Sequence, residues 1–105
     1  MPRGVRATEN EIAFAVLQIA ASQPNGVATF PRMKRDVPNY INLSDEDRQR
    51  SITRPNEEIW EQLIRNIKSH YQTQGNYICE GYLEHVPKSG YRITDEGRRY
   101  LKSRS

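Results

Sequence analysis

The stretch ITRPNEEIWEQLIRNIKSHY, residues 52–71, decides the fold, because it is the longest segment with a clear helical period and it holds the only tryptophan. At about 100° per residue, its apolar side chains form one stripe wide enough to be buried, made of Ile59, Trp60, Leu63, Ile64, Ile67 and Tyr71. The opposite face is polar and carries Glu58, Glu61, Gln62, Arg65, Lys68, Ser69 and Gln72. We therefore predict a helix over 52–71 whose apolar face is the core of the fold and whose polar face is either solvated or contacts a ligand.

Length and composition limit what the chain can be. Its 105 residues allow one domain with a modest core, and the net charge of +3 suits a polyanionic partner without requiring one. Cys79 is the single cysteine and cannot form an internal disulfide, so we expect a packing residue in a cytoplasmic protein. The sequence contains no apolar signal segment and no apolar run as long as a membrane span, so we expect neither secretion nor membrane insertion.

The N-terminal part begins with a short basic segment, residues 1–7, which we expect to be a flexible, solvated arm. Thr8 and Glu11 have the spacing of a capping box and predict the start of a scaffold helix over 9–22. Turn residues follow this helix and lead into a short predicted strand over 27–29.

A second helix is predicted over 31–37, because proline is favoured in the first helical turn and Pro38 should end the helix. Its outward side chains form the densest basic cluster of the chain, made of Arg32, Lys34 and Arg35. For this cluster, contact with a nucleic-acid backbone and simple solvation are equally weighted alternatives.

Two capping signals precede the long helix. Ser44 is followed by three acidic residues, which favour the N-terminal end of a helix, and this predicts a short helix over 45–51. Thr53 is expected to cap the long helix, with Pro55 in its first turn.

Beyond the long helix the pattern changes to short β runs. Residues 72–76 have the chemistry of a helix C-terminus, and 77–80 could be a helical turn or an extended segment. Two runs, 82–86 and 91–94, predict a hairpin with Lys88 at its tip.

The chain is predicted to end in a helix over 95–103, capped by Thr94, with Tyr100 and Leu101 facing inward. The predicted order is therefore helix, strand, helix, short helix, long helix, hairpin and helix. This is the order of a winged helix-turn-helix, an α+β, mainly α fold, in a single domain over 8–105.

Two blocks of sequence carry a family resemblance. The first consists of Trp60, Ile64-Arg65-Asn66-Ile67 and Ser69-His70, and the second of Glu80-Gly81-Tyr82-Leu83-Glu84, Tyr91-Arg92-Ile93-Thr94-Asp95, Gly97-Arg98 and Tyr100-Leu101. Together they resemble the winged-helix domain that precedes the nuclease in Mrr-type restriction endonucleases, over about half of the chain. The resemblance implies double-stranded DNA binding, with a recognition helix over 54–72 in the major groove and a wing over 82–94.

The chain departs from that family in two places. Residues 71–79 are inserted between the long helix and the wing, and the sequence ends at Ser105 without a nuclease domain. We therefore expect any DNA cleavage to come from a nuclease or methyltransferase partner, or the chain to be a fragment of a longer protein. The role is that of a transcriptional regulator or of the DNA-recognition part of a restriction system. Because many winged helices read two half-sites, a homodimer is a further expectation.

DNA recognition needs base-edge contacts for specificity and phosphate contacts for affinity. Arginine matches guanine and glutamine matches adenine, so the base-edge candidates on the polar face are Gln62 and Arg65, with Asn66 and Ser69 as weaker ones. The candidates for backbone contacts are the basic side chains Arg32, Lys34, Arg35, Arg54, Lys68, Lys88 and Arg92.

Three acidic residues oppose this assignment. Glu57, Glu58 and Glu61 lie in the first half of the predicted helix and would repel phosphates unless they accept from cytosine or pair with Arg54 and Arg65. The spacing of Glu61 and Arg65 also favours an ion pair within the helix.

The two histidines do not indicate catalysis. His70 falls on the apolar side of the long helix and is expected to be a core residue, and His85 is expected on the surface near the wing. No spacing typical of a catalytic set or a metal site is evident, so we predict a binding protein without cofactor or metal rather than an enzyme. The rival prediction is a winged-helix protein-interaction module without DNA binding, whose partner surface combines the acidic half of the long helix with Tyr71, Tyr77 and Tyr82.

Overall fold

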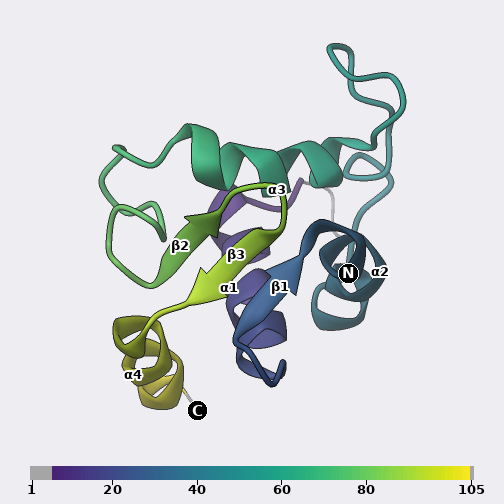
Figure 1. The fold of residues 1–105 in the computed structure, drawn as a ribbon. Coiled ribbons are helices and arrows are strands. Elements are labelled where there is room, and N and C mark those ends of the chain that lie inside the picture. The colour runs from purple at the N-terminus through teal and green to yellow at the C-terminus, as the bar shows by residue number, and fades with distance from the viewer. Residues whose placement is uncertain (1–5, 105) are drawn as a thin grey trace.

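The chain folds into helices and a small antiparallel sheet (Figure 1). The structure is a computed structural model and describes residues 6–104; the predicted arm at 1–7 lies mostly outside the described residues. Over this range it is an α+β fold of four helices and three strands. In chain order the elements are α1 (Glu9–Ala21), β1 (Val27–Thr29), α2 (Phe30–Tyr40), α3 (Ile59–Ser69), β2 (Leu83–Val86), β3 (Gly90–Ile93) and α4 (Asp95–Ser103).

The sheet has the order β1-β3-β2, and both pairings are antiparallel. Because side chains alternate along a strand, Tyr91 and Ile93 face the core while Arg92 faces outward. Gly90 lies opposite Thr29, and a Cβ added to this glycine would stand 2.0 Å from the carbonyl oxygen of Ala28. The close pairing of β1 with β3 therefore requires glycine at position 90.

The centre of the core is α1, not the long helix that the sequence indicated. Its capping box is formed as predicted, with the Thr8 hydroxyl accepting the Glu11 N–H at 3.1 Å and Glu11 accepting the Thr8 N–H at 2.8 Å. Seven of its side chains are buried: Ile12, Ala13, Ala15, Val16, Leu17, Ile19 and Ala20. In Figure 1, α1 runs behind the sheet with α2 and α4 on either side and α3 across one end, and it contacts all three helices.

The predicted helix over 52–71 is wrong at its N-terminal end, because α3 begins only at Ile59. Glu58, not Thr53, is its N-cap residue, and the Glu58 N–H donates to the Glu61 carboxylate at 2.8 Å. The helix cannot extend backwards because the backbone before it pairs with an earlier segment, as in the Ile59 N–H to Gln49 carbonyl bond of 2.8 Å. Trp60, Ile64 and Ile67 are buried as expected, Ile59 and Leu63 are half-buried, and Tyr71 is exposed.

The short helix predicted over 45–51 is also wrong, since residues 45–48 form turns. Asp47 is fully buried, and its carboxylate accepts the N–H groups of Ala7 at 2.8 Å and Ser44 at 2.9 Å. Arg50 then forms an antiparallel bridge with Glu58. The acidic run therefore anchors a loop to the start of α1 instead of beginning a helix.

The predicted end of α2 at Pro38 is wrong, because the helix continues through Pro38 to Tyr40. Proline removes one backbone donor, but the Ile41 N–H still bonds to the Val37 carbonyl at 3.2 Å. Burial of Met33 and Val37 holds this helix on the core.

Residues 70–82 form successive turns that are organised by Asn76, which is 2% exposed. Its amide donates to the Ile67 carbonyl at 2.9 Å, and its oxygen accepts the N–H of Ile78 at 2.7 Å. The segment left open by the sequence is therefore an ordered connection that packs on the end of α3. Cys79 is exposed in it, so the expectation of a packed cysteine is wrong.

The C-terminal elements agree with the sequence. The bounds of the two hairpin strands lie within one residue of the predicted bounds, and α4 spans the predicted range of residues 95–103. Thr94 accepts the Gly97 N–H at 2.9 Å as the predicted cap, and Tyr100 and Leu101 pack against the core. Among the described residues, no helix is long and apolar enough to cross a membrane.

The hairpin is fastened to α3 by one buried hydroxyl. Tyr91 is fully buried, donates to the Ile64 carbonyl at 2.7 Å and accepts the Lys68 N–H at 3.1 Å. These two backbone groups are four residues apart, the spacing of one helical hydrogen bond. The hydroxyl therefore fixes the hairpin at one position along α3.

Replacing Tyr91 by phenylalanine keeps the ring but removes both hydrogen bonds, so we expect the free energy of unfolding to fall by about 1–2 kcal/mol. Burial raises the pKa of Tyr91 to about 12 from its ordinary value of 10.0. The contribution of the neutral hydroxyl is complete below about pH 10 and is lost as the pH rises through about 12. Urea denaturation from pH 8 to about 12 should show the gap between the two proteins shrinking in that window. Tyr40→Phe, at an exposed tyrosine, is the control and should change neither quantity.

Candidate nucleic-acid interface

A groove of about 400 Å³ lies between α3, the β2–β3 hairpin and the loop that precedes α3. We call it the basic groove; its lining residues are Phe30, Arg54, Arg65, Lys68, Ser69, His85, Pro87, Lys88 and Tyr91. Five of the eleven predicted site residues line it: Arg54, Arg65, Lys68, Ser69 and Lys88. Tertiary structure thus brings together side chains that are up to 34 residues apart in the sequence, since Arg54 and Lys88 share one groove.

Three cations of the basic groove come from three different elements. Arg54 belongs to the loop before α3, Lys68 to α3 and Lys88 to the hairpin turn. All three are exposed, and within residues 6–104 none of them has a carboxylate partner. Their positive charge is therefore available to an anion.

Arg65 differs from these three because it is already paired. Its guanidinium donates through Nε to both oxygens of Glu57, at 3.0 and 2.9 Å, and its Nη2 lies 2.7 Å from the same carboxylate. Lys34 lies 3.4 Å from Glu57 on the other side. Hydrogen bonding from Arg65 lowers the pKa of Glu57, although burial acts in the opposite direction. Arg65 nevertheless keeps 41% of its side chain exposed, so Glu57 holds the guanidinium in place without covering it.

Gln62 lies on α3, and its side chain holds the preceding loop in place. Its amide oxygen accepts the Ser51 hydroxyl at 2.6 Å, and its amide nitrogen donates to the Thr53 hydroxyl at 3.2 Å. A base edge would have to displace both bonds. Asn66 is half-buried and lies outside the basic groove, and Ser69 bonds back to the Arg65 carbonyl at 3.4 Å.

The positive charge of the basic cluster on α2 is partly neutralised by Asp36 of the same helix. Arg32 and Arg35 both contact Asp36, at 3.4 and 2.9 Å, and Lys34 is the residue that contacts Glu57. The hydrogen bond from Arg35 lowers the pKa of Asp36. None of these three predicted backbone-contact residues lines the basic groove.

Arg92 also lies outside the basic groove. It pairs with Glu84 across the two hairpin strands at 2.7 Å, on the sheet face opposite to Tyr91. The sequence did not show this, because strand register decides which face a residue occupies.

The acidic residues before and within α3 have structural roles. Glu57 is buried and pairs with Arg65, which was one of the two arginines expected as a partner for these acids. It also pairs with Lys34. Glu58 accepts the Trp60 indole N–H at 2.8 Å, and Glu61 caps the helix. The ion pair expected between Glu61 and Arg65 is replaced by the pair with Glu57, because Glu57 lies outside the helix and can face the guanidinium directly.

His85 was expected on the surface but is half-buried in the basic groove, with its ring 6.0 Å from that of Tyr91. Burial, and then the charge of Lys68, lower the pKa of His85. The imidazole is therefore neutral near pH 7 and can accept or donate one hydrogen bond. His85, Phe30, Pro87 and Tyr91 are groove-lining residues that the sequence did not assign to the site. The available signal was the alternation along β2, which puts His85 on the same face as Leu83 and opposite Tyr91 of β3.

His70 is not the core residue that the helical wheel indicated. It caps the C-terminal end of α3, is about half exposed, and has its Nδ1 2.6 Å from a carboxylate oxygen of Glu9. The wheel placed it inside because α3 was expected to continue to Tyr71. Among the described residues, no group of three or more His, Cys, Asp or Glu side chains could hold a metal ion.

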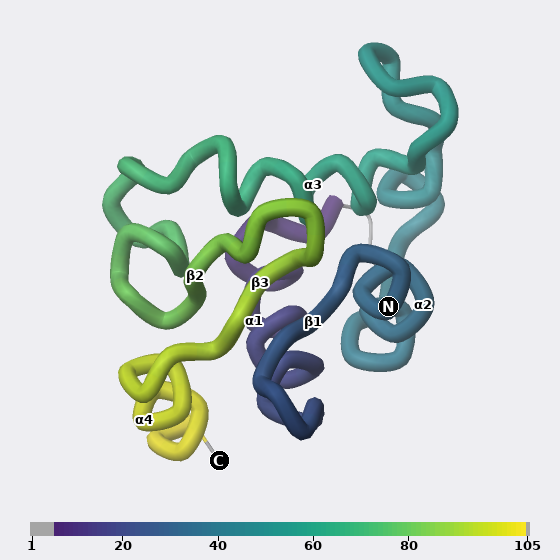
Figure 2. The backbone as a smooth tube through the Cα atoms, viewed as in Figure 1, coloured from purple at the N-terminus to yellow at the C-terminus, as the bar shows by residue number. Residues whose placement is uncertain are grey.

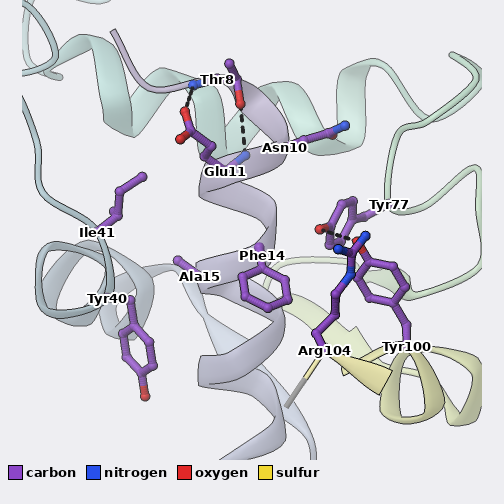
Figure 3. Close-up of a pocket in the computed structure, with 10 residues that line it drawn as sticks. All are labelled: Thr8, Asn10, Glu11, Phe14, Ala15, Tyr40, Ile41, Tyr77, Tyr100 and Arg104. Carbon is purple, nitrogen blue, oxygen red and sulfur yellow. Dashed lines mark hydrogen bonds between the residues drawn. The ribbon is translucent and has the colours of Figure 1, made fainter. Parts of the chain in front are cut away.

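A second concave region lies on the α1 side of the molecule (Figure 3). We call it the aromatic groove; it measures about 510 Å³ and has Phe14 of α1 between Tyr40 and Ile41 on one side and Tyr77, Tyr100 and Arg104 on the other. The Arg104 guanidinium lies 4.9 Å from the centre of the Tyr100 ring.

The tyrosines of the predicted partner surface do not form one exposed patch. Tyr77 is buried and Tyr82 is stacked on Tyr100 with ring centres 4.2 Å apart, so only Tyr71 of the three is exposed.

No protein-family model, no curated protein and no solved structure matches this chain. The resemblance to the winged-helix domain of Mrr-type endonucleases therefore stays a prediction.

Replacing Glu57 by glutamine should destabilise the protein by about 1–3 kcal/mol at pH 7, because it removes the charge that holds Arg65 and Lys34. The folded protein lowers the pKa of Glu57 below its ordinary value of 4.5. The stability from Glu57 is therefore present above about pH 4.5 and is lost as the pH falls through the lowered pKa. Chemical denaturation between pH 7 and about 3 should show the difference between the two proteins shrinking on the acid side. Glu46→Gln is the matched control in the same loop, because Glu46 is exposed.

Proposed function

We propose that this chain is a winged-helix protein that binds double-stranded DNA, with α3 in the major groove and the β2–β3 hairpin as the wing on the backbone. The observation that carries the proposal is the basic groove, where Arg54, Lys68 and Lys88 converge from three elements without a carboxylate partner among residues 6–104. The order of helices and strands along the chain is compatible with a winged helix, which supports the same assignment.

The hairpin turn supports a phosphate contact by Lys88. This residue has φ 64°, a left-handed conformation that glycine adopts far more readily than lysine. A non-glycine residue there costs about 1 kcal/mol, and such strain is typical of functional positions. A phosphate contact would account for a lysine at this position, and the exposed side chain of Lys88 in the lining of the basic groove suits a phosphate.

Arg65 is the proposed base reader. Glu57 binds its Nε and Nη2 and thereby orients the guanidinium, which leaves part of the fork free for a base edge. The proposal places Arg54, Lys68 and Lys88 on phosphates and assigns Gln62 to loop structure. The described contacts of Arg32, Arg35 and Arg92 with neighbouring carboxylates make them weaker phosphate contacts than the three groove cations.

The role we propose is binding rather than catalysis, as a regulator or as the DNA-recognition part of a restriction system with a separate nuclease or methyltransferase. A homodimer on two half-sites would fit either role.

A second candidate function, the binding of a protein partner, is favoured by the aromatic groove. Phe14, Tyr40 and Tyr100 line this groove, and Tyr40 is 44% exposed. Aromatic side chains are enriched at the centres of protein interfaces.

Fluorescence anisotropy with a labelled mixed-sequence duplex separates the two candidates. A DNA-binding protein should bind at about 50 mM salt and lose affinity steeply as the salt concentration rises. Absence of binding at that salt concentration would favour the protein partner.

Lys88→Gly should weaken DNA binding by a similar factor on every sequence and make the slope of log K against log salt shallower by about 0.9, the value of one phosphate contact. The same change relieves the left-handed strain, so thermal unfolding should show equal or greater stability. Lys102→Ala, a loss of the same charge on α4 outside the basic groove, is the control and should leave the slope unchanged.

Arg65→Ala should instead reduce the preference of the protein for its best sequence over a mixed duplex, by about tenfold, because a bidentate base contact is worth about 1–3 kcal/mol. A library selection followed by anisotropy on the recovered sequence measures this ratio. A loss that is equal on all sequences would show that Arg65 contacts the backbone instead.

A further inference from the structure

The tip of the loop between α2 and α3 projects away from the rest of the molecule (Figures 1 and 2). Ile52 lies in this loop and is 97% exposed, the largest exposed fraction among the large hydrophobic side chains that the structure describes. Ile52 therefore contributes nothing to the core, and its side chain is accessible to an external ligand.

The base of the loop is a defined structure rather than an open chain. The Ser51 N–H bonds to the Glu57 carbonyl at 2.8 Å, next to the bridge between Arg50 and Glu58. The Ser51 hydroxyl donates to Gln62 of α3 at 2.6 Å and accepts the Arg54 N–H at 3.2 Å. The tip, residues 52–56, is therefore held at its base by backbone pairing of residues 50–51 with 57–58 and by the bond from Ser51 to α3.

The charged residues nearest to Ile52 in the sequence are arginines. Arg48, Arg50 and Arg54 lie within four residues of it and are all exposed. Arg48 is 3.6 Å from Glu58 and Arg50 donates to the Pro55 carbonyl at 3.3 Å, while Arg54 has no such partner among the described residues. An apolar tip between arginines is complementary to a nucleic acid, whose phosphates flank an apolar base stack.

The tip also belongs to the same surface as the basic groove. Arg54, two residues from Ile52, lines this groove together with Lys68 and Lys88. A duplex that lies on the basic groove would therefore extend past the N-terminal end of α3 toward the tip.

We propose that Ile52 is a wedge that enters the minor groove of the bound duplex and partly separates two stacked base pairs, beside the major-groove site of α3. Apolar side chains inserted in this way kink DNA by about 20–90°. Arg48, Arg50 and Arg54 would contact the phosphates on either side of the kink. This proposal rests on the proposed function and adds deformation of the DNA as a source of specificity.

The test compares Ile52→Ala with the parent protein on a duplex of about 30 base pairs, whose two ends carry a fluorescence energy-transfer pair. The parent should shorten the distance between the ends, and a 2-aminopurine at the kinked step should brighten as it unstacks. Ile52→Ala should abolish both signals and weaken binding by about tenfold, the factor expected for losing a buried apolar side chain.

Two further variants control for trivial effects. Ile52→Leu keeps an apolar wedge and should keep the bend. Tyr71→Ala removes another exposed hydrophobic side chain, beyond the other end of α3, and should leave bend and affinity unchanged. Because Ile52 is almost fully exposed, Ile52→Ala should unfold at the parental temperature.

Each outcome bears on one of the two proposals. An unchanged bend and affinity in Ile52→Ala, with Lys88→Gly still weakened, would overturn the wedge and leave DNA binding intact. No binding of the parent to any duplex at low salt would overturn both. Binding to anionic lipid vesicles that depends on Ile52, without DNA bending, would show that the tip inserts into a membrane surface and would also overturn the wedge.

Discussion

The buried hydroxyl of Tyr91 is the contact on which the proposed interface depends. By bonding to the Ile64 carbonyl and the Lys68 N–H, it sets the β2–β3 hairpin at one height along α3. Lys88 at the hairpin turn and Lys68 on the helix thereby line a single groove. Without this contact the hairpin would be joined to α3 by the turns of residues 70–82 and by apolar packing, which is less directional than a hydrogen bond.

The start of α3 is governed by a second polar cluster, which accounts for the acidic residues beside the basic groove. Glu57 is buried and orients Arg65, while Glu58 and Glu61 satisfy groups at the first helical turn. The acids therefore build the geometry of the groove instead of competing with its ligand. The same backbone pairing that makes α3 begin at Ile59 also presents Ile52 on an exposed tip.

Much of the fold could be predicted because its signals are local. Thr8 and Thr94 cap two helices, as predicted, through bonds to residues three positions ahead, a spacing that the sequence displays directly. The candidate site was predicted less well. Five of the groove-lining residues were named, whereas Phe30, His85, Pro87 and Tyr91 were not, and Arg92 was named although it lies outside the groove, because strand register was unknown.

The sequence by itself determined the order of the elements apart from the short helix expected over 45–51, most of the apolar faces of α1 and α3, and the basic character of the hairpin turn, since each follows from periodicity or turn chemistry within about ten residues. Only the tertiary structure decided where α3 begins and which charges remain free. Both depend on partners distant in sequence: Gln49 pairs with Ile59, Lys34 with Glu57, and Tyr91 with α3. The stretch 52–71 is therefore two structures, an exposed loop and a shorter helix, because the hydrogen bonds of its first residues are satisfied outside the helix.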